Sequence, residues 1–280
     1  MRSPSLATST PTNTTPTLYV ALLEKIKPTV AKGWKWRYEN GVAAQSEEFS
    51  LTVNDISQLA EQSLCKNQVQ PTYVKQQVKN NDIYILMFYE FDEASTRRTQ
   101  RIMLQRVPAG FILARIKEST NLYLDIICAG DRQRHFVTHS GAIMIEMATE
   151  YARSKKLEQV SLSSLPPVLT YYPRFDFKHR PSCSQPSDIG IPQVLKDRTK
   201  NRTLPTTLNE AYNDEDVLDY MSELQLKKYG TRYDKDCSTR GKSKAVVKKS
   251  MKDARCGDDG FKMRLCLKNN SPKSSQLFAQ

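Results

Sequence analysis

Apolar residues change their spacing several times along the chain, and each spacing predicts a kind of element. The continuous apolar and aromatic run DIYILMFYEF (82–91) is typical of a strand buried on both faces. AGFILARIKES (109–119) and NLYLDIICAG (121–130) predict two more strands, close enough in sequence to pair as antiparallel neighbours. EEFSLTV (47–53) predicts a short strand before them, and QVSLSSL (159–165) predicts one after them.

Four segments carry apolar residues three and four positions apart, which predicts amphipathic helices. In the first, Asn54 is placed to cap a helix after the strand at 47–53. The second has Pro71 in its first turn. The third begins near Ser140 and ends in a basic pair, and the fourth covers 213–229. The apolar positions of the first helix are Ile56, Leu59, Ala60 and Leu64.

The remaining segments have less regular patterns. TLYVALLEKI (17–26) predicts a short helix, and GWKWRYENG (33–41) predicts a strand or a binding loop. FDFKHRPSC (175–183) and GFKMRLCLK (260–268) predict strands. Three consecutive strands before one long helix, followed by a strand, a helix and a strand, indicate an α/β protein. We expect a mixed sheet with helices on both of its faces.

The pattern also suggests a division of the chain into parts. The first residues are mostly Ser, Thr and Pro, which predicts disorder. The later polar segment interrupts the strands and contains one clear helix. The expected parts are a disordered tail (1–17), an N-terminal extension (18–46), a main domain (47–183 with 257–268), a polar insertion (184–256) and a C-terminal tail (269–280).

The composition of the 280 residues indicates a soluble protein, because 26% are charged and the mean hydropathy is −0.58. No stretch approaches the roughly 20 apolar residues that a membrane span needs, so no membrane partner is expected. The N-terminal sequence MRSPSLATSTPTNTTPT has no apolar signal core. We therefore expect an intracellular protein, cytoplasmic or nuclear, that is not secreted.

The cysteines and histidines do not predict a metal site. The six cysteines are scattered with no C-x-x-C pair, which favours reduced thiols in an intracellular compartment. His135 and His139 lie four residues apart, a spacing that is usually polar surface when no other ligand accompanies it.

The net charge of +12 is unevenly distributed. The run RGKSKAVVKKSMKDAR (240–255) contains a single acidic residue, Asp253. Such a run attracts nucleic acid, or it forms a solvated loop. Trp34, Trp36 and Tyr38 alternate with basic residues, so they are candidates to stack on bases or to cover the edge of a core.

The stretch VSLSSLPPVLTYYPRFDF (160–177) carries the most specific motif. A strand breaks at two prolines and a short helix follows, ending in YPRFDF (172–177). This segment resembles the Tyr-x-x-x-Gly-Phe motif of the GNAT superfamily of acyl-CoA-dependent N-acyltransferases. The resemblance covers about 47–183 and the strand at 260–268. The strand at 121–130 and this stretch are also similar to a divergent GNAT branch of large DNA viruses and protists.

The resemblance implies an acyl-CoA cosubstrate, most simply acetyl-CoA. No metal cofactor is expected, because the cysteines and histidines lack the spacing of metal ligands. It implies that the sheet is splayed between its fourth and fifth strands, at 121–130 and 159–165. The thioester carbonyl would meet a backbone N–H on the fourth strand, and the pyrophosphate would rest at the start of the following helix. The implied cofactor-binding residues are Ile126, Ile127, Cys128, Arg132, Arg134, Ser140, Gly141, Ala142 and Ser163.

Elementary physics agrees with the pyrophosphate position, because a helix N-terminus offers unpaired N–H groups and a positive dipole end. Gly141 permits a close backbone approach, and Arg132 and Arg134 add positive charge. The chain nevertheless departs from the family. No register of 137–143 reproduces the Arg/Gln-x-x-Gly-x-Gly/Ala loop, and Asp176 replaces the usual Gly before the last Phe. Asp tolerates left-handed backbone geometry better than most residues.

The implied mechanism gives Tyr172 the role of general acid. A tyrosine with an ordinary pKa near ~10 stays protonated at neutral pH and can donate to the departing thiolate. Tyr171 points elsewhere on the helix and is assigned to packing. Asp125 is a candidate general base, or it fixes a bulge or loop in its strand. Cys128 is a candidate nucleophile, or it packs as a small apolar residue.

The sequence therefore predicts an N-acetyltransferase that transfers acetyl from acetyl-CoA directly to an amine. Two alternatives stay open. The degenerate phosphate loop is compatible with an inactive binding or scaffold protein of the same fold. The basic run 240–255 is compatible with a nucleic-acid-associated protein.

Overall fold

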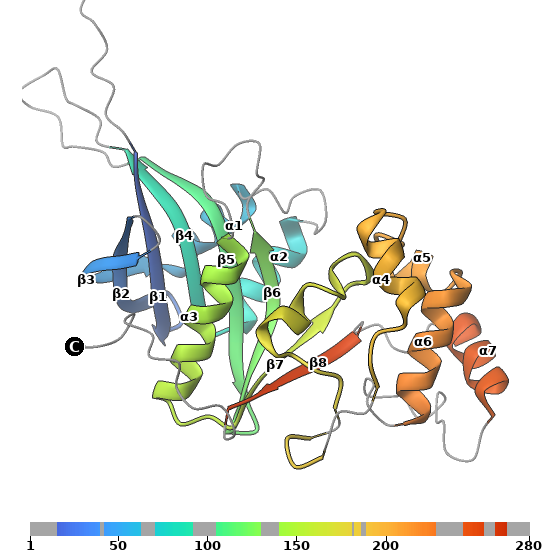
Figure 1. Cartoon of the computed structure of the whole chain (residues 1–280). Coiled ribbons are helices and arrows are strands. Elements are labelled where there is room, and N and C mark those ends of the chain that lie inside the picture. Colours follow the sequence, from blue (N-terminus) through green and yellow to red (C-terminus); the bar gives the residue numbers. More distant parts are fainter. Residues whose placement is uncertain are drawn as a thin grey trace, which may run out of the picture. The chain divides into compact units, whose positions relative to one another are not determined.

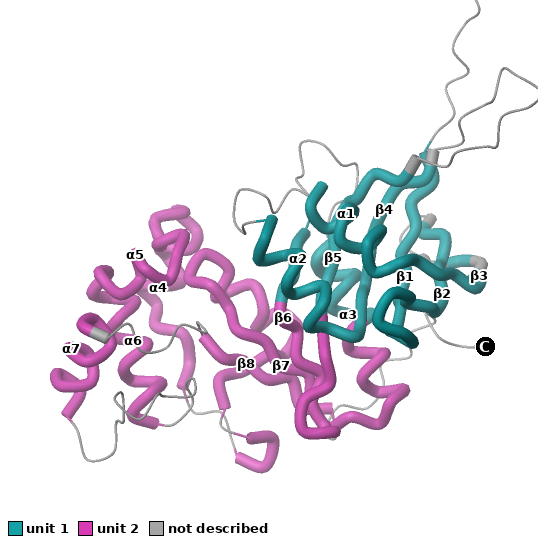
Figure 2. The backbone as a smooth tube through the Cα atoms, turned by 180° about the vertical axis from the view of Figure 1, so that it is seen from behind, with its two compact units in different colours: residues 1–113, 126–147 teal, residues 114–125, 148–280 magenta. Residues whose placement is uncertain are grey.

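The structure is a computed structural model that describes residues 16–39, 42–62, 71–91, 105–129, 140–180, 182–185, 189–227, 243–254 and 261–267. The chain forms two compact units, and each contains segments that are distant in sequence. Unit 1 holds residues 1–113 and 126–147, and unit 2 holds residues 114–125 and 148–280 (Figure 2).

Eight strands form one sheet, in the order β3-β2-β1-β4-β5-β6-β7-β8 (Figure 1). The β1–β2, β1–β4, β2–β3 and β7–β8 pairs are antiparallel, whereas β6 and β7 are parallel. The predicted mixed α/β sheet is therefore confirmed. The strands are β1 (Thr17–Lys27), β2 (Val30–Glu39), β3 (Val42–Thr52), β4 (Ile83–Phe91), β5 (Gln105–Lys117), β6 (Asn121–Ala129), β7 (Gln159–Ser164) and β8 (Phe261–Cys266).

The helix predicted at 17–26 is wrong, because this segment is β1. β1 pairs with β2 on one side and with β4 on the other, so both of its edges are satisfied. Its apolar residues Val20, Ala21 and Leu23 are buried on alternating faces. The spacing of apolar residues in this segment fits a helix, but pairing with β2 and β4 on both sides favours a strand. The segment expected as an N-terminal extension thus contributes strands to the sheet.

The segment 33–41 was predicted as a strand or a binding loop, and its described residues belong to β2. The strand predicted at 47–53 is part of β3, which begins earlier, at Val42. Trp36 is only 8% exposed and packs in the core, while Trp34 is 41% exposed. Of these two tryptophans, Trp34 alone presents an accessible ring.

Helices α1 (Val53–Gln62) and α2 (Pro71–Asn80) confirm two predictions. The predicted cap at Asn54 is wrong, because α1 begins one residue before it. The Asp55 N–H donates to Thr52 Oγ1 at 3.1 Å, and the Thr52 N–H donates to Asp55 Oδ2 at 3.0 Å. Thr52 therefore caps α1 through a reciprocal pair of hydrogen bonds. Ile56, Leu59 and Ala60 are buried as predicted, and Leu64 lies outside the described residues.

Unit 1 has apolar side chains on both faces of its strands. One face packs with α1 and α2 around Leu86, Phe88, Phe111 and Leu113. The other face receives the start of α3 (Ser140–Ser154), because a Cβ on Gly110 would lie 2.8 Å from Met144 Cε. Helices on both faces of the sheet were predicted, and Figure 1 shows α3 on the side opposite α1 and α2.

Unit 2 contains a second core, built mainly by α4 (Gln193–Lys200), α5 (Leu208–Ala211), α6 (Glu215–Leu226) and α7 (Lys244–Ala254). The predicted helix at 213–229 corresponds to α6. Its cap is Asp214, whose carboxylate accepts a hydrogen bond from the Val217 N–H at 3.2 Å. The polar insertion is therefore a helical part with its own core, which also takes in Leu169 and Phe261.

The basic run 240–255 is not a solvated loop where the structure describes it, because Lys244–Ala254 form α7. Val247 and Met251 are buried in the second core. Lys244 Nζ lies 2.7 Å from Asp219 Oδ2, and Lys248 Nζ lies 3.1 Å from Asp219 Oδ1. Two lysines of the run thus serve to attach α7 to α6.

The strand predicted at 175–183 is also wrong. Two short 3₁₀ helices, η2 (Pro166–Val168) and η3 (Tyr172–Phe175), follow β7. Beyond them, in the described part of 176–183, an isolated bridge joins Lys178 to Arg264 of β8. The backbone of Asp176 has a positive φ of 64°, which ends η3 and turns the chain away from an extended path. Continuous strand pairing cannot start there.

The prediction of reduced thiols is wrong for the described cysteines. Cys183 and Cys266 form a disulfide across 83 residues of sequence, and Cys128 is also disulfide-bonded. No cysteine in the described part of the chain is free. Sequence spacing fails here because the Cys183–Cys266 pairing depends on β8 returning to the sheet beside β7.

Candidate functional site

The parallel ladder between β6 and β7 is short. It pairs Asn121 with Gln159 at its start and Leu124 with Leu162 at its end. β6 itself continues to Ala129, and β7 continues to Ser164. The ladder thus stops immediately before Asp125, close to the predicted point of parting, although residues 160–162 are still paired. Where two neighbouring strands stop pairing, their backbone N–H and C=O groups become available to a ligand.

Polar side chains of unit 2 gather along β5, β6 and β7 at this point. The Tyr123 hydroxyl lies 3.2 Å from Ser163 Oγ, so the two side chains connect neighbouring strands at the end of their ladder. Ser163 was predicted as a cofactor-binding residue. The Lys117 ammonium lies 3.3 Å from the centre of the Tyr123 ring. This contact is a cation–π interaction that fixes the ring.

Asp125 forms an ion pair with Arg115 of the neighbouring strand. Arg115 Nε lies 3.1 Å from Asp125 Oδ2, and Arg115 Nη2 donates to Asp125 Oδ1 at 3.3 Å. The Asp125 side chain is 10% exposed, so this partner compensates the burial of its charge. Arg115 lies against both oxygens of the carboxylate. The structure therefore favours the structural alternative for Asp125.

Burial alternates regularly along β6. Tyr123, Asp125 and Ile127 are partly exposed, and the residues between them are buried: Leu122, Leu124, Ile126 and Cys128. Adjacent residues of a regular strand point to opposite faces. Tyr123 and Asp125 therefore share the face on which Lys117 and Arg115 contact them.

The sequence left two alternatives open for Asp125: a general base, or a residue that fixes a bulge or loop in its strand. Burial alternates through Asp125 and Ile126 without a break. The carboxylate is held by Arg115 of β5. The sequence did not predict this partner, because it depends on the register between β5 and β6.

The predicted pyrophosphate residues lie at the start of α3 where the structure describes them. Ser140 is the first residue of the helix and is 5% exposed, and Gly141 is also buried. Ala142 and Ile127 are half-buried. Arg132 and Arg134, together with His135 and His139, lie outside the described residues.

Tyr172 opens η3 and is 8% exposed. Burial, and secondarily the neighbouring Tyr171, raises the pKa of its phenol well above the ordinary value. The ring meets Tyr171 edge-on at 5.5 Å and Phe177 at 6.1 Å. No described residue forms a hydrogen bond with its hydroxyl. Tyr172 is therefore a protonated donor in a fixed ring position.

The residues around Tyr172 explain how this position is fixed. Tyr171, predicted to pack, contacts Phe175 edge-on at 5.2 Å. Asp176 stands where the family motif has Gly, and it adopts the left-handed conformation that Gly favours. Its N–H donates to the Pro173 carbonyl at 3.1 Å. Phe177 is fully buried behind Tyr172. An αL residue other than Gly is strained unless its surroundings hold it.

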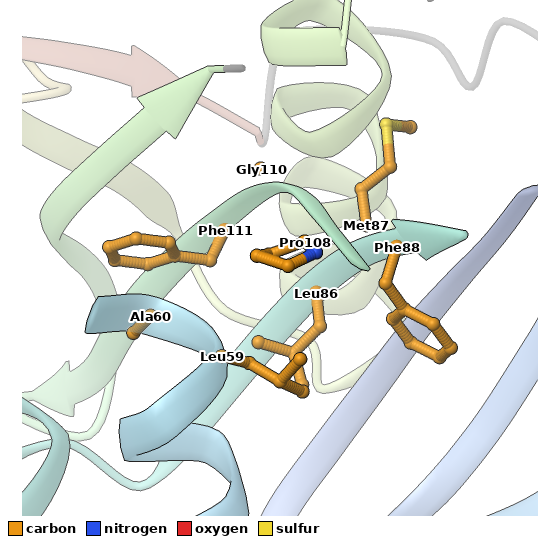
Figure 3. Close-up of a pocket in the computed structure, with 8 residues that line it drawn as sticks. All are labelled: Leu59, Ala60, Leu86, Met87, Phe88, Pro108, Gly110 and Phe111. Atoms are coloured by element: carbon orange, nitrogen blue, oxygen red, sulfur yellow. The ribbon is translucent and has the colours of Figure 1, made fainter. Parts of the chain in front are cut away.

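One apolar hollow in unit 1 is too small for a ligand. Figure 3 shows its lining residues, which come from α1, β4 and β5. Side chains fill it so completely that it has no space for a water molecule. It is lined by Leu59, Ala60, Leu86, Met87, Phe88, Pro108, Gly110 and Phe111. We assign it to packing.

Two negative observations concern the described part of the chain. Its side chains include no group of three or more His, Cys, Asp or Glu placed to hold a metal ion. None of its helices is both long and apolar enough to cross a membrane.

Sequence reasoning missed Arg115, Lys117 and Tyr123. Their alternation along β5 and β6 was visible, but which residues meet across the hairpin was not. Cys128, the alternative nucleophile, is disulfide-bonded, so it has no thiol to react. This correction removes covalent catalysis through Cys128.

No protein-family model matches the chain, and no curated protein matches it. Solved structures similar to the chain include GCN5 from Tetrahymena, with 10% identity, a TM-score of 0.34 and coverage of 51% of this chain and 76% of that chain. A GNAT-family acetyltransferase from Desulfovibrio desulfuricans has 12% identity, a TM-score of 0.35 and coverage of 57% and 86%. PaiA N-acetyltransferase from Thermoplasma acidophilum, solved with coenzyme A, has 11% identity, a TM-score of 0.29 and coverage of 48% and 87%. Because these values are low, the function proposed below rests on the chain's own residues.

Proposed function

We propose that this protein is an acyl-CoA-dependent N-acyltransferase of the GNAT type that transfers an acetyl group from acetyl-CoA to an amine. The observation that carries the proposal is the short parallel ladder of β6 and β7, which ends at Leu124 and Leu162. Strands that stop pairing expose backbone groups that a thioester and its pantetheine amides can use. The helix that joins these strands, α3, begins with Ser140 and Gly141.

The part of β6 beyond its ladder with β7 supports a role in transition-state stabilisation. Attack of the amine on the thioester converts its carbonyl oxygen to an oxyanion. A backbone N–H within Asp125–Cys128 would donate to this oxyanion, an interaction worth about 3–4 kcal/mol when the donor is preorganised. The ion pair between Arg115 and Asp125 would hold this part of β6 against β5.

Tyr172 supplies the second chemical role. Collapse of the tetrahedral intermediate breaks the C–S bond, and the electron pair leaves on sulfur. Burial raises the pKa of Tyr172, so the phenol is protonated at neutral pH and can donate a hydrogen bond to the departing thiolate. The proton lost by the attacking amine reaches the thiolate through water and the Tyr172 hydroxyl. The products are the N-acetyl amine and free coenzyme A, and no covalent enzyme intermediate forms.

The test is release of free coenzyme A from acetyl-CoA in the presence of a panel of amines and peptides. We expect Tyr172→Phe to reduce the rate at least about tenfold, since general-acid catalysis contributes about 10²–10⁴-fold. Tyr171→Phe is the matched control, because it removes the same atom from the neighbouring residue. Equal rates for both variants would remove Tyr172 from the mechanism.

An inactive binding protein of the same fold is the second candidate. The departure of 137–143 from the family's phosphate-loop motif favours it. In that case acetyl-CoA either fails to raise the melting temperature, or raises it while no amine in the panel is acetylated. Turnover on any amine rejects this candidate.

The nucleic-acid hypothesis loses support from α7. Lys244 and Lys248 pair with Asp219 of α6, so the run presents less free positive charge than its sequence indicates. Phosphate binding weakens steeply with salt. Binding to a mixed nucleic acid that disappears when 240–255 is deleted, and that falls with rising salt, would restore the hypothesis.

A further inference from the structure

The Cys183–Cys266 disulfide closes the helical insertion at its base. Cys183 follows the segment that carries Tyr172, and Cys266 is the last residue of β8. The helices α4, α5, α6 and α7 all lie between the two cysteines in sequence. One covalent bond therefore joins the start of the helical part to its return into the sheet.

The two sulfur atoms have opposite electrostatic surroundings. Arg180 Nη1 lies 3.3 Å from Cys266 Sγ. On the other side, Gln159 Oε1 lies 3.4 Å from Cys183 Sγ. A guanidinium stabilises negative charge on a nearby sulfur, whereas a carbonyl oxygen disfavours it. If the bond opens, the negative charge therefore belongs on Cys266.

The position of Arg180 is set by contacts that do not involve the disulfide. Its carbonyl accepts a hydrogen bond from Arg264 Nη1. The backbone of Lys178 exchanges two hydrogen bonds with Arg264, of 2.9 and 3.0 Å. No carboxylate among the described residues pairs with Arg180, and its Nε is buried without a hydrogen-bond partner there. The cation would thus remain beside Cys266 after the bond has opened.

Access to the two sulfurs also differs. Cys183 is partly exposed, while Cys266 is buried, with 7% of its surface exposed. An external thiolate must approach the sulfur that it attacks and push the other one out. The exposed sulfur is Cys183, and the sulfur that is stabilised on leaving is Cys266. Accessibility and electrostatics favour the same direction of opening.

We propose that Cys183 and Cys266 form a thiol–disulfide exchange site that reacts with small thiols of the glutathione class in one direction. The thiolate attacks Cys183, the Cys183–Cys266 bond breaks, and its electron pair leaves on Cys266. A mixed disulfide on Cys183 results. A second thiolate attacks the sulfur of the bound glutathione, releasing oxidised glutathione and leaving Cys183 reduced. The site thereby opens the base of the helical insertion, and oxidised glutathione closes it by the reverse steps, being reduced to two glutathione thiols. The site does not depend on the proposed acetyl transfer.

The experiment uses the full-length protein after air oxidation, with reduced glutathione as the probe at neutral pH. Samples are quenched by alkylation at short times, and peptide mass spectrometry locates glutathione and free thiols at 183 and 266. We expect glutathione on Cys183 to exceed that on Cys266 by about tenfold. We expect Arg180→Gln to slow opening about five- to tenfold, and Arg180→Lys to retain most of the rate, because it keeps the positive charge.

Arg202→Gln is the charge-matched control, because Arg202 is exposed elsewhere in unit 2 and should leave the rate unchanged. Three results overturn the proposal: glutathione found mainly on Cys266, a rate for Arg180→Gln within twofold of the unmodified protein, or free thiols at 183 and 266 after oxidation. If Arg180→Gln does not fold, the position of glutathione on the unmodified protein decides the question alone.

Discussion

At the residue scale, the ion pairs of the buried Lys35 are a feature that the sequence did not predict. Lys35 lies in β2 and is 7% exposed, with its ammonium 2.8 Å from Glu90 and 3.0 Å from Glu47. Glu90 also accepts from Arg106 Nε at 2.9 Å. Burial alone would lower the pKa of Lys35, but its hydrogen bonds to Glu90 and Glu47 outweigh burial and raise it. Glu90 is thus the shared partner of two cations.

Replacing this shared partner should destabilise unit 1. Glu90→Gln keeps the shape of the side chain but leaves Lys35 and Arg106 without their common negative charge. Removing one partner of a buried pair is expected to lower the free energy of unfolding by about 3 kcal/mol. Urea denaturation measures the change. Glu48→Gln is the control, because Glu48 is exposed and its ion-pair partner within the described ranges, Lys32, is exposed as well. Equal stabilities of the two variants would contradict the prediction.

His179 gives unit 2 a dependence on pH. It is 2% exposed, and burial lowers its pKa to about 4, although the hydrogen bond of Nδ1 to the Lys262 carbonyl opposes the shift. The unfolded chain, with an ordinary pKa near ~6.5, binds the proton first as pH falls. The free energy of unfolding should therefore fall between about pH 6.5 and pH 4, by about 1–2 kcal/mol at pH 5.

Chemical denaturation of the unmodified protein and of His179→Gln at several pH values checks this prediction. The difference in slope between the two proteins isolates the contribution of His179. Parallel curves between pH 7 and pH 5 would mean that His179 titrates normally and is not held neutral in the fold.

At the scale of elements, sequence patterns were most informative where the residues within a strand or helix determine its formation. The long run at 82–91, the helix from Ser140 and the helix capped by Asp214 were predictable, because periodicity and capping are local. The segment 17–26 failed because β1 obtains both of its neighbours from elsewhere in the chain. The ion pair of Arg115 with Asp125 was not predicted, for the same reason. The register between two strands cannot be read from the sequence of one strand.

The approach of α3 to β5 is a contact between elements that a single residue tests. A Cβ on Gly110 would lie 2.8 Å from the Cys128 carbonyl oxygen and 2.8 Å from Met144 Cε. Gly110→Ala should therefore force a shift of α3 or β6 and lower stability by about 1–3 kcal/mol. A Cβ on Gly190 would have no atom within 4 Å, so Gly190→Ala is the matched control and should be nearly neutral.

Thermal unfolding followed by circular dichroism compares the two alanine variants directly. A lower melting temperature for Gly110→Ala than for Gly190→Ala is expected. Equal melting temperatures would show that α3 does not approach β5 as described.

At the scale of the whole molecule, the function depends on an arrangement that no single motif encodes. Tyr172 was identified from its resemblance to a family motif, and its burial and fixed ring are compatible with that role without testing it. The end of the β6–β7 ladder was approximately predictable, whereas the disulfide at the base of the helical insertion was not. The disulfide depends on contacts between residues that are distant in sequence, so it became visible only in three dimensions.

The central claim is that acyl-CoA binds where β6 and β7 stop pairing. Hydrogen–deuterium exchange with and without acetyl-CoA tests it most directly, with ATP as the control for phosphate binding alone. The account predicts slower exchange in peptides covering 121–129 and 159–164 with acetyl-CoA, and not with ATP. Unchanged exchange in both peptides at saturating acetyl-CoA, or equal protection by ATP, would contradict it.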